Sequence, residues 1–442
     1  MKSWLAGIGV GAVVGVGLIG ASSVSWTGAT AQDSRAETYG KLDIFGDILS
    51  RVQSDYVTEI DDAEAIEAAI NGMLTSLDPH SGYLNPEDFR DIQVDTSGEY
   101  GGLGIEVLPE DGFVKVVAPI DDTPASRAGL KSGDLLTAIN GRQIVGLPLN
   151  DAVKEMRGIV GTDITITVLR EGVDPFDVTL TREVIRPKSV RWEMKEGDIG
   201  YVRVSSFNDL TTELLEDALA EIARESGGKP DGLVLDLRNN PGGLLDQAIS
   251  VSELFLSGGE VVSTFGRHSF NDKRYPANKE QVFKDVPMIV IINSGSASAA
   301  EIVAGALQDR ERARILGVTS FGKGSVQTVI PLGADRGALR LTTARYYTPS
   351  GRSIQGTGID PDIEVAAERI TEEELERIRL FSSEADLPNA LENEDGSERR
   401  RPHIPADQPP EGYDEDGDYQ LDRALDILRD PATFASIVGR AG

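Results

Sequence analysis

The sequence predicts a multidomain protein of the α+β and α/β classes, in which a helical region and then a β-rich module precede an α/β core. A chain of 442 residues has room for roughly two to four domains. Between residues 200 and 310, short apolar runs rich in β-branched residues alternate with helical patterns, as in a sheet covered by helices. Between residues 100 and 181, short strand patterns and tight-turn signals dominate instead.

The composition excludes several classes of function. A formal net charge of −30 argues against binding to nucleic acid, because no basic patch could neutralise the phosphates. The absence of cysteine excludes disulfides, thiolate metal sites and cysteine nucleophiles. The chain has three histidines, none placed beside a candidate nucleophile, and neither an HExxH pattern nor a carboxylate cluster. The sequence therefore predicts no metal and no cofactor.

Residues 1–31 have the pattern of a targeting segment. Lys2 precedes an apolar stretch from Trp4 to about Ala21, and Ala29-Thr30-Ala31 then offers a small-residue cleavage site. The segment is interpreted as a signal peptide, or as an uncleaved membrane anchor because the apolar stretch is long. Both interpretations predict an exported protein, in the periplasm or at the periplasmic face of the inner membrane.

Residues 36–98 are predicted to form an N-terminal helical region. Apolar residues such as Leu42, Phe45 and Leu49 recur at helical spacing, and Ile66, Ile70 and Met73 repeat the pattern. We interpret this region as a packing and dimerisation element, which predicts a homo-oligomer.

Residues 99–185 resemble a PDZ domain in the order of their predicted elements. The tight-turn pair Asn140-Gly141 follows one strand, and a helix is predicted from Leu149 to Met156. The resemblance implies a carboxylate-binding loop, which matches Gly101, Gly102, Leu103, Gly104 and Ile105. Consecutive backbone N–H groups there can hold a peptide's terminal carboxylate while the peptide adds as a strand. The glycines taken alone fit a hairpin equally well.

The stretch from Pro287 to Leu307 predicts a buried strand, a turn of small residues and a helix. Ser298 occupies the strand-to-helix turn, where its hydroxyl is exposed beside the free N–H groups of the helix. That arrangement suits a nucleophile with an oxyanion site. Ser298 and Glu301 also match the S-x-x-E capping box, so this stretch alone leaves both interpretations open.

A second glycine-rich stretch, Phe321 to Gln327, contains Lys323. Neighbouring glycines and a following apolar strand predict that this lysine is partly buried, which lowers its pKa and suits a general base. A surface lysine on a turn is the alternative. A P-loop has the same G-x-x-x-x-G-K spacing but requires Ser or Thr where Gly324 stands, and a helix where a strand is predicted.

The chain resembles the carboxyl-terminal-processing peptidases, the tail-specific serine proteases. Three motifs in the family's order carry the resemblance: Asp236 to Gly243 (DLRNNPGG), Gly295 to Glu301 (GSASAAE), and Phe321 to Gly324 (FGKG). The resemblance implies a crotonase-like α/β protease core over residues 190–368, to which strands before the PDZ domain can contribute.

The resemblance also implies the roles of the site residues. Ser298 corresponds to the nucleophile and Lys323, 25 positions later, to the base. Gln327 matches a glutamine found in some members and would orient Lys323. Gly242 or Gly243 would form the oxyanion hole with the amide of Ala299, although Pro-Gly-Gly can also be a simple turn. Asp309 matches an accessory acidic residue, but it also has the position of an ordinary helix-end charge.

Residues 369–442 are predicted to form a charged, partly disordered tail with short helices. Residues 383–418 are rich in charge, Pro and Gly, and are predicted to be largely disordered. Tyr419 to Leu428 is amphipathic, and it could dock on the enzyme or on a partner.

The sequence thus predicts an exported serine endopeptidase with a Ser-Lys dyad that recognises the C-terminal tails of proteins. Its expected partners are protein substrates with apolar tails, an activating adaptor and a second copy of the chain. The alternative is a catalytically silent PDZ adaptor that retains the protease fold as a scaffold.

Overall fold

The computed structural model describes residues 30–434, apart from 111, 121, 171, 269–271, 334, 374, 376–382, 395, 415–416 and 431. The chain divides into two units, Met1–Ala68 and Ala69–Gly442. The predicted apolar leader lies outside the described residues. Among the residues that are described, no helix is long and apolar enough to cross a membrane.

The predicted N-terminal region consists of helices and one short strand: α1 (Thr30–Asp55), α2 (Asp62–Thr75), β1 (Gly82–Leu84) and α3 (Pro86–Ser97). α3 begins where the side chain of Asn85 accepts hydrogen bonds from two backbone N–H groups of the first turn, and it ends at Gly98 with a φ of 72°. Apolar side chains on α1 are exposed, including Leu42, Phe45 and Ile48.

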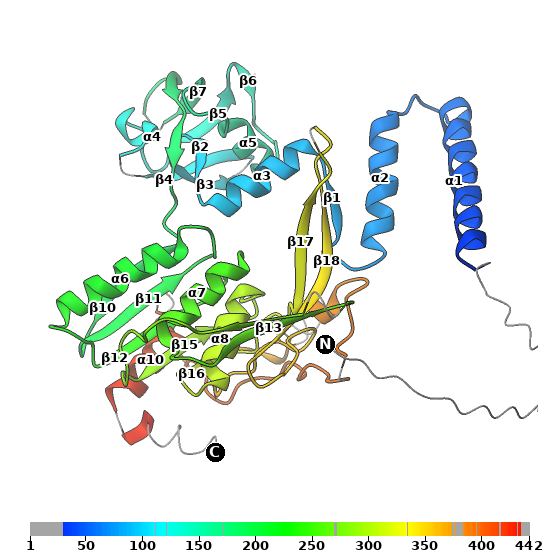
Figure 1. Cartoon of the computed structure of the whole chain (residues 1–442). Coiled ribbons are helices and arrows are strands. Elements are labelled where there is room, and N and C mark those ends of the chain that lie inside the picture. Colours follow the sequence, from blue (N-terminus) through cyan, green and yellow to red (C-terminus); the bar gives the residue numbers. More distant parts are fainter. Residues whose placement is uncertain are drawn as a thin grey trace, which may run out of the picture. The chain divides into compact units, whose positions relative to one another are not determined.

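The β-rich module forms a sheet in the order β3-β4-β5-β7-β8, with β6 paired to β5 and a separate ribbon of β2 and β9 (Figure 1). The predicted turn Asn140-Gly141 has positive φ at both residues, 49° and 77°. The elements are β2 (Tyr100–Gly102), β3 (Ile105–Glu110), β4 (Phe113–Pro119), α4 (Pro124–Arg127), β5 (Leu135–Ile139), β6 (Arg142–Gln143), α5 (Leu149–Met156), β7 (Asp163–Leu169), β8 (Phe176–Thr181) and β9 (Glu183–Ile185).

The core is built on a six-stranded sheet in the order β10-β11-β12-β15-β16-β19. Its strands are parallel except for the antiparallel pair β10 and β11. The elements of this layer are β10 (Val190–Lys195), β11 (Ile199–Val204), α6 (Thr211–Glu225), β12 (Gly232–Asp236), α7 (Leu245–Phe255), β15 (Met288–Ile292), α8 (Ala299–Asp309), β16 (Arg314–Gly317) and β19 (Ile363–Glu364).

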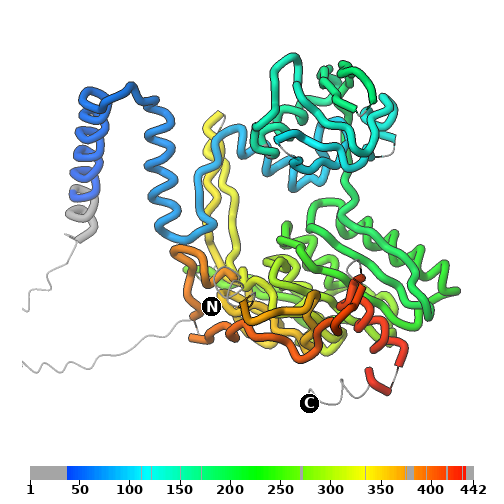
Figure 2. Tube along the Cα trace, turned by 180° about the vertical axis from the view of Figure 1, so that it is seen from behind, coloured from blue at the N-terminus to red at the C-terminus, as the bar shows by residue number. Residues whose placement is uncertain are grey.

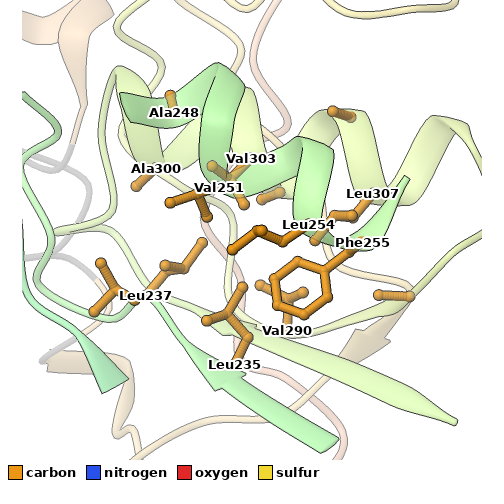
Figure 3. Close-up of a cluster of buried hydrophobic side chains, with 14 of the residues drawn as sticks. Leu235, Leu237, Ala248, Val251, Leu254, Phe255, Val290, Ala300, Val303 and Leu307 are labelled. Carbon is orange, nitrogen blue, oxygen red and sulfur yellow. The ribbon is translucent and has the colours of Figure 1, made fainter. Parts of the chain in front are cut away.

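Both faces of this sheet are covered, which explains why β12 and β15 are apolar at nearly every position. Successive side chains of a strand point to opposite faces. Leu235 and Val290 therefore join the cluster beneath α7 and α8, which includes Leu254 and Val303 (Figure 3). Val234 faces the other way and packs against the C-terminal helix α10 (Tyr419–Arg429).

A second sheet stands beside the first, in the order β1-β18-β13-β14 with β17 paired to β18. β1 precedes the β-rich module in sequence, and it pairs with β18 of this sheet. The other strands are β13 (Glu260–Gly266), β14 (Lys273–Pro276), β17 (Ser325–Pro331) and β18 (Ala338–Tyr347).

The expectation of a largely disordered stretch over residues 383–418 differs from the structure. Glu384 is buried in the short helix η2 (Glu384–Asp386). The chain that follows it runs along the core (Figure 2). The reason is that polar side chains of this stretch bond to the core, which a low apolar content does not reveal. The sequence left open whether this helix docks on the enzyme or on a partner, and in the structure α10 packs against the sheet of the core.

Candidate active site

Ser298 occupies the turn between β15 and α8. Its backbone has φ 54° and ψ −112°, a sparsely populated conformation that costs a non-glycine residue about 1–3 kcal/mol. Such strain at a strand-to-helix serine is typical of a nucleophile elbow. A Cβ atom added at Gly242 would lie 2.8 Å from the Cβ of Ser298, so glycine is required beside this turn.

The Glu301 carboxylate joins the turn of Ser298 to the loop of Lys323. Its Oε2 accepts hydrogen bonds from the backbone N–H groups of Ser298 (2.7 Å) and Lys323 (2.9 Å). Its Oε1 accepts from Ser320 Oγ (2.6 Å) and from the Gly322 N–H (2.7 Å). The predicted contact between Glu301 and the Ser298 backbone is thus present, but the same side chain also fixes a loop about twenty residues further on.

Burial raises the pKa of the Glu301 carboxyl group above its ordinary value. The side chain is completely buried, and desolvation raises its pKa to about 7 although all four hydrogen bonds lower it. A proton on this carboxyl would face N–H and O–H donors, so ionisation of Glu301 and the geometry of both loops are coupled.

Lys323 is half-buried, as its glycine-rich surroundings predict. Burial lowers its pKa, and the charges of Glu384, Glu301 and Asp78 oppose this effect while that of Arg340 adds to it. Within the described part of the chain, no hydrogen bond to Lys323 Nζ is formed. An ammonium without acceptors is costly in such surroundings, which favours the neutral amine.

Ser298 and Lys323 line one cleft of about 600 Å³. Gln327 lines it as well, but its amide donates to Ser325 Oγ (3.0 Å) and Thr342 Oγ1 (3.3 Å). The expected contact between Gln327 and Lys323 is not formed among the described residues, and its orienting role stays a prediction.

Tyr346, which the sequence did not single out, also lines the cleft. The neighbouring Ser298 side chain acts to lower the pKa of its phenol. Burial raises the pKa of Tyr346 to about 12, so the phenol is neutral at physiological pH. Tyr346 lies on β18, which pairs with β17 just after the lysine loop, and only the tertiary fold brings it to the serine.

The backbone donors near Ser298 are not equivalent. The Gly242 N–H donates to Asn240 Oδ1 (2.9 Å), whereas no acceptor lies within bonding distance of the Gly243 N–H in the described structure. The Ala299 N–H belongs to the first turn of α8, where backbone donors lack partners within the helix. Gly243 and Ala299 thus have N–H groups available for an oxyanion.

Asp309 lies at the far end of α8. Eleven residues at 1.5 Å each put it roughly 16 Å from Ser298. Its carboxylate accepts hydrogen bonds from the Ser350 N–H (3.0 Å) and Arg352 Nη2 (3.4 Å). These partners agree with the interpretation as a helix-end charge.

The predicted carboxylate-binding loop borders a separate groove of about 190 Å³ in the β-rich module. Gly102, Leu103, Gly104 and Ile105 line it, and Gly101 lies beside it in the β2–β9 ribbon. Gly104 has a φ of 76°, and a Cβ atom there would lie 2.2 Å from Thr123, so the loop depends on glycine. Further apolar lining is supplied by Val107, Val153 and Met156.

The fold and the cleft together define a serine peptidase with a PDZ domain. Comparison with known proteins agrees at the level of domains. The profile of peptidase family S41 matches residues 198–365, that of the PDZ domain matches residues 115–170, and that of the activating protease CtpB N-terminal domain matches residues 17–88.

Whole-chain relatives extend this match. A carboxy-terminal-processing protease of Bartonella bacilliformis is 48% identical over 96% of this chain and 96% of its own length. The carboxy-terminal processing protease CtpA of Bacillus subtilis is 35% identical over 75% of this chain and 70% of its own. The solved photosystem II D1 C-terminal processing protease is 29% identical, covers 78% of this chain and 92% of its own, and has a TM-score of 0.44. The S41 profile and the relatives from Bartonella bacilliformis and Bacillus subtilis show that the chain belongs to the S41 family of carboxy-terminal-processing serine peptidases.

Proposed function

We propose that this peptidase is an exported endopeptidase that cleaves proteins with a Ser298–Lys323 dyad after its PDZ domain has bound their apolar C-terminal tails. The observation that carries the dyad is the Glu301 carboxylate, which bonds to the backbone of both residues at the edge of one cleft. The leader pattern of residues 1–31 supports export, to the periplasm or the periplasmic face of the inner membrane.

The reaction is acyl transfer. Ser298 Oγ attacks the scissile carbonyl carbon while its proton passes to the neutral amine of Lys323. The N–H groups of Gly243 and Ala299 stabilise the oxyanion, and Lys323 returns the proton to the leaving amine. Water then attacks the acyl-enzyme while Lys323 accepts its proton, and Lys323 passes this proton to Ser298 Oγ as the ester bond breaks and the carboxylate product leaves. The neutral phenol of Tyr346 lines the same cleft as the serine hydroxyl.

The partners follow from the surfaces outside the cleft. The apolar groove beside Gly104 suits an apolar side chain next to a free carboxylate. Exposed apolar side chains on α1, such as Phe45 and Ile48, suit contact with a second copy of the chain or with an activating adaptor.

We expect cleavage of an unstructured reporter peptide to rise with pH as Lys323 loses its proton. Because burial lowers the pKa of this lysine, the midpoint of the rise should lie below about 10.4, the value of a solvated lysine. Ionisation of Glu301 near pH 7 should act in the same direction. The measurement is kcat/KM against pH, and a rate that stays flat or rises only with the titration of a solvated lysine contradicts the assignment.

We expect the PDZ groove to read the end of the substrate. Hydrogen bonds to a charged group contribute about 1.5–3 kcal/mol, so a reporter with a free apolar tail should differ roughly tenfold or more in rate from its amidated form. A reporter that ends in Asp-Asp tests the apolar requirement. Equal rates for all three reporters contradict tail reading.

The variant Gly104→Ala distinguishes two roles for the PDZ domain, delivery of substrates and inhibition of the protease. An added Cβ would collide with Thr123 and distort the loop, so the tail preference should disappear. A lower rate on the apolar tail would mean that the domain delivers substrates, and a raised rate that ignores the tail would mean that it holds the protease inactive.

A further inference from the structure

The C-terminal part of the chain contacts the loop that carries Lys323. The Phe321 carbonyl accepts two hydrogen bonds from it, one from the Glu384 N–H (3.0 Å) and one from Arg399 Nη1 (2.9 Å). Glu384 is 1% exposed, and burial lowers the pKa of Arg399, so neither contact is a loose surface encounter. The backbone two residues before Lys323 is therefore fixed by residues far beyond the protease motifs.

The buried side chain of Gln355 contacts Gly324, the residue that follows Lys323. Gln355 Oε1 accepts from the Gly324 N–H (3.1 Å), and Gln355 Nε2 donates to Glu384 Oε1 (3.2 Å) and to the Leu391 carbonyl (3.1 Å). Asn393 Nδ2 donates to the Gln355 carbonyl (2.9 Å). Gln355 is fully buried, so its contacts transmit the position of the C-terminal stretch to Gly324.

The start of the C-terminal helix α10 contacts the loop that leads to Gly243. Asp418, at the start of α10, pairs with Arg238 through two hydrogen bonds of 2.7 and 2.6 Å. Arg238 also bonds to Asp236 at the end of β12, a few residues before Gly243. The apolar face of α10 anchors this contact against the sheet.

We propose that residues 384–394 and 396–399 together with α10 form an intramolecular brace that positions both catalytic loops, and that Glu384 is the positioning residue through which the brace acts on Lys323. The proposal rests on the Ser298–Lys323 dyad. It assigns a role in the reaction to a part of the chain that lies beyond the stretch matched by the S41 profile.

Glu384 has an electrostatic as well as a geometric connection to the base. Its negative charge opposes the lowering of the Lys323 pKa, together with Glu301 and Asp78, while Arg340 acts in the opposite direction. His80 Nε2 lies 2.8 and 3.0 Å from the Glu384 oxygens and fixes the carboxylate from the N-terminal side. Replacing Glu384 with glutamine therefore removes one negative charge near Lys323 and weakens the contacts on both sides.

The test compares Glu384→Gln with Glu398→Gln, the same substitution at an exposed position of the same stretch. For Glu384→Gln we expect kcat to fall roughly tenfold or more, because small displacements of catalytic groups are costly. We also expect the acidic limb of its pH–rate profile to move to lower pH, since the amine becomes easier to deprotonate. Glu398→Gln should match the unaltered enzyme. A merely structural role for Glu384 would lower the rate without moving the limb.

The outcomes separate the brace from the dyad. If the acidic limb of the pH–rate profile does not move in Glu384→Gln while Lys323→Ala is inactive, the brace is overturned and the dyad is supported. An active Lys323→Ala enzyme overturns the dyad and the brace with it. If Glu384→Gln fails to fold, the brace is tested with Asp418→Asn instead. The Asp418 side chain is 41% exposed, so this variant should fold. A lowered kcat at unchanged KM then supports the brace, and a kcat equal to that of the unaltered enzyme overturns it.

Discussion

Replacing either Ser298 or Lys323 with alanine is expected to reduce proteolysis by roughly 10⁴-fold or more, because a nucleophile and its base act as a unit. Both side chains line the cleft, and the Lys323 ammonium group makes no hydrogen bond among the described residues, so neither loss should unfold the protein. The measurements are kcat/KM on an unstructured reporter and the thermal unfolding midpoint.

Ser296→Ala provides the matched control, two residues before the nucleophile. Ser296 Oγ donates to the Leu237 carbonyl (2.8 Å) and accepts from the Asn293 N–H (3.0 Å), so it supports the turn. Its loss should cost about 1–3 kcal/mol of stability while the folded enzyme stays active. If Ser298→Ala kept a substantial rate and Ser296→Ala lost it, the nucleophile would be misassigned.

Replacing Glu301 with glutamine is expected to have the second largest effect. A glutamine amide would direct N–H groups at two of the four donors that now bond to the carboxylate. Each buried donor left without an acceptor costs about 1–3 kcal/mol, so both the unfolding midpoint and kcat should fall strongly.

The control for this change is Glu213→Gln. Glu213 occupies the first turn of α6 as Glu301 occupies that of α8, but its side chain is exposed. This variant should keep both its stability and its rate. Equal behaviour of the two variants would show that the carboxylate does not hold the loops.

The pH dependence of stability gives a further check on Glu301. Its pKa is raised from 4.5 to about 7 in the folded protein, so the folded state binds this proton more tightly than the unfolded state does. The contribution of this group to stability is therefore greatest below about pH 4.5 and decreases as the pH rises towards 7. Glu301→Gln removes that dependence.

Local patterns were sufficient for the parts of the site that lie on single turns. Ser298 follows a buried apolar strand and Lys323 lies among glycines, so their neighbours in sequence reveal them. Glu301 was visible only as a helix cap, since its bonds to Gly322 and Lys323 depend on how the chain folds back.

Residues that reach the site across the fold had no local signal. Tyr346 lies near the end of strand β18, and Glu384 and Asp418 come from a charged stretch whose composition predicted disorder. The stabilisation there comes from buried hydrogen bonds and ion pairs to the core, which composition does not report. The parallel sheet and the PDZ-type module were predictable because hydrophobic periodicity and turn residues encode them directly.

The most direct test of the central claim is to map where a fluorophosphonate probe reacts with the full chain. Intact-mass and peptide mass spectrometry should find one adduct, on Ser298, that forms faster as the pH rises through the titration of Lys323. The adduct should form only very slowly in Lys323→Ala and be absent in Ser298→Ala. An adduct on Ser296, no adduct at all, or labelling of Ser298 at an unchanged rate in Lys323→Ala would contradict the Ser298–Lys323 mechanism.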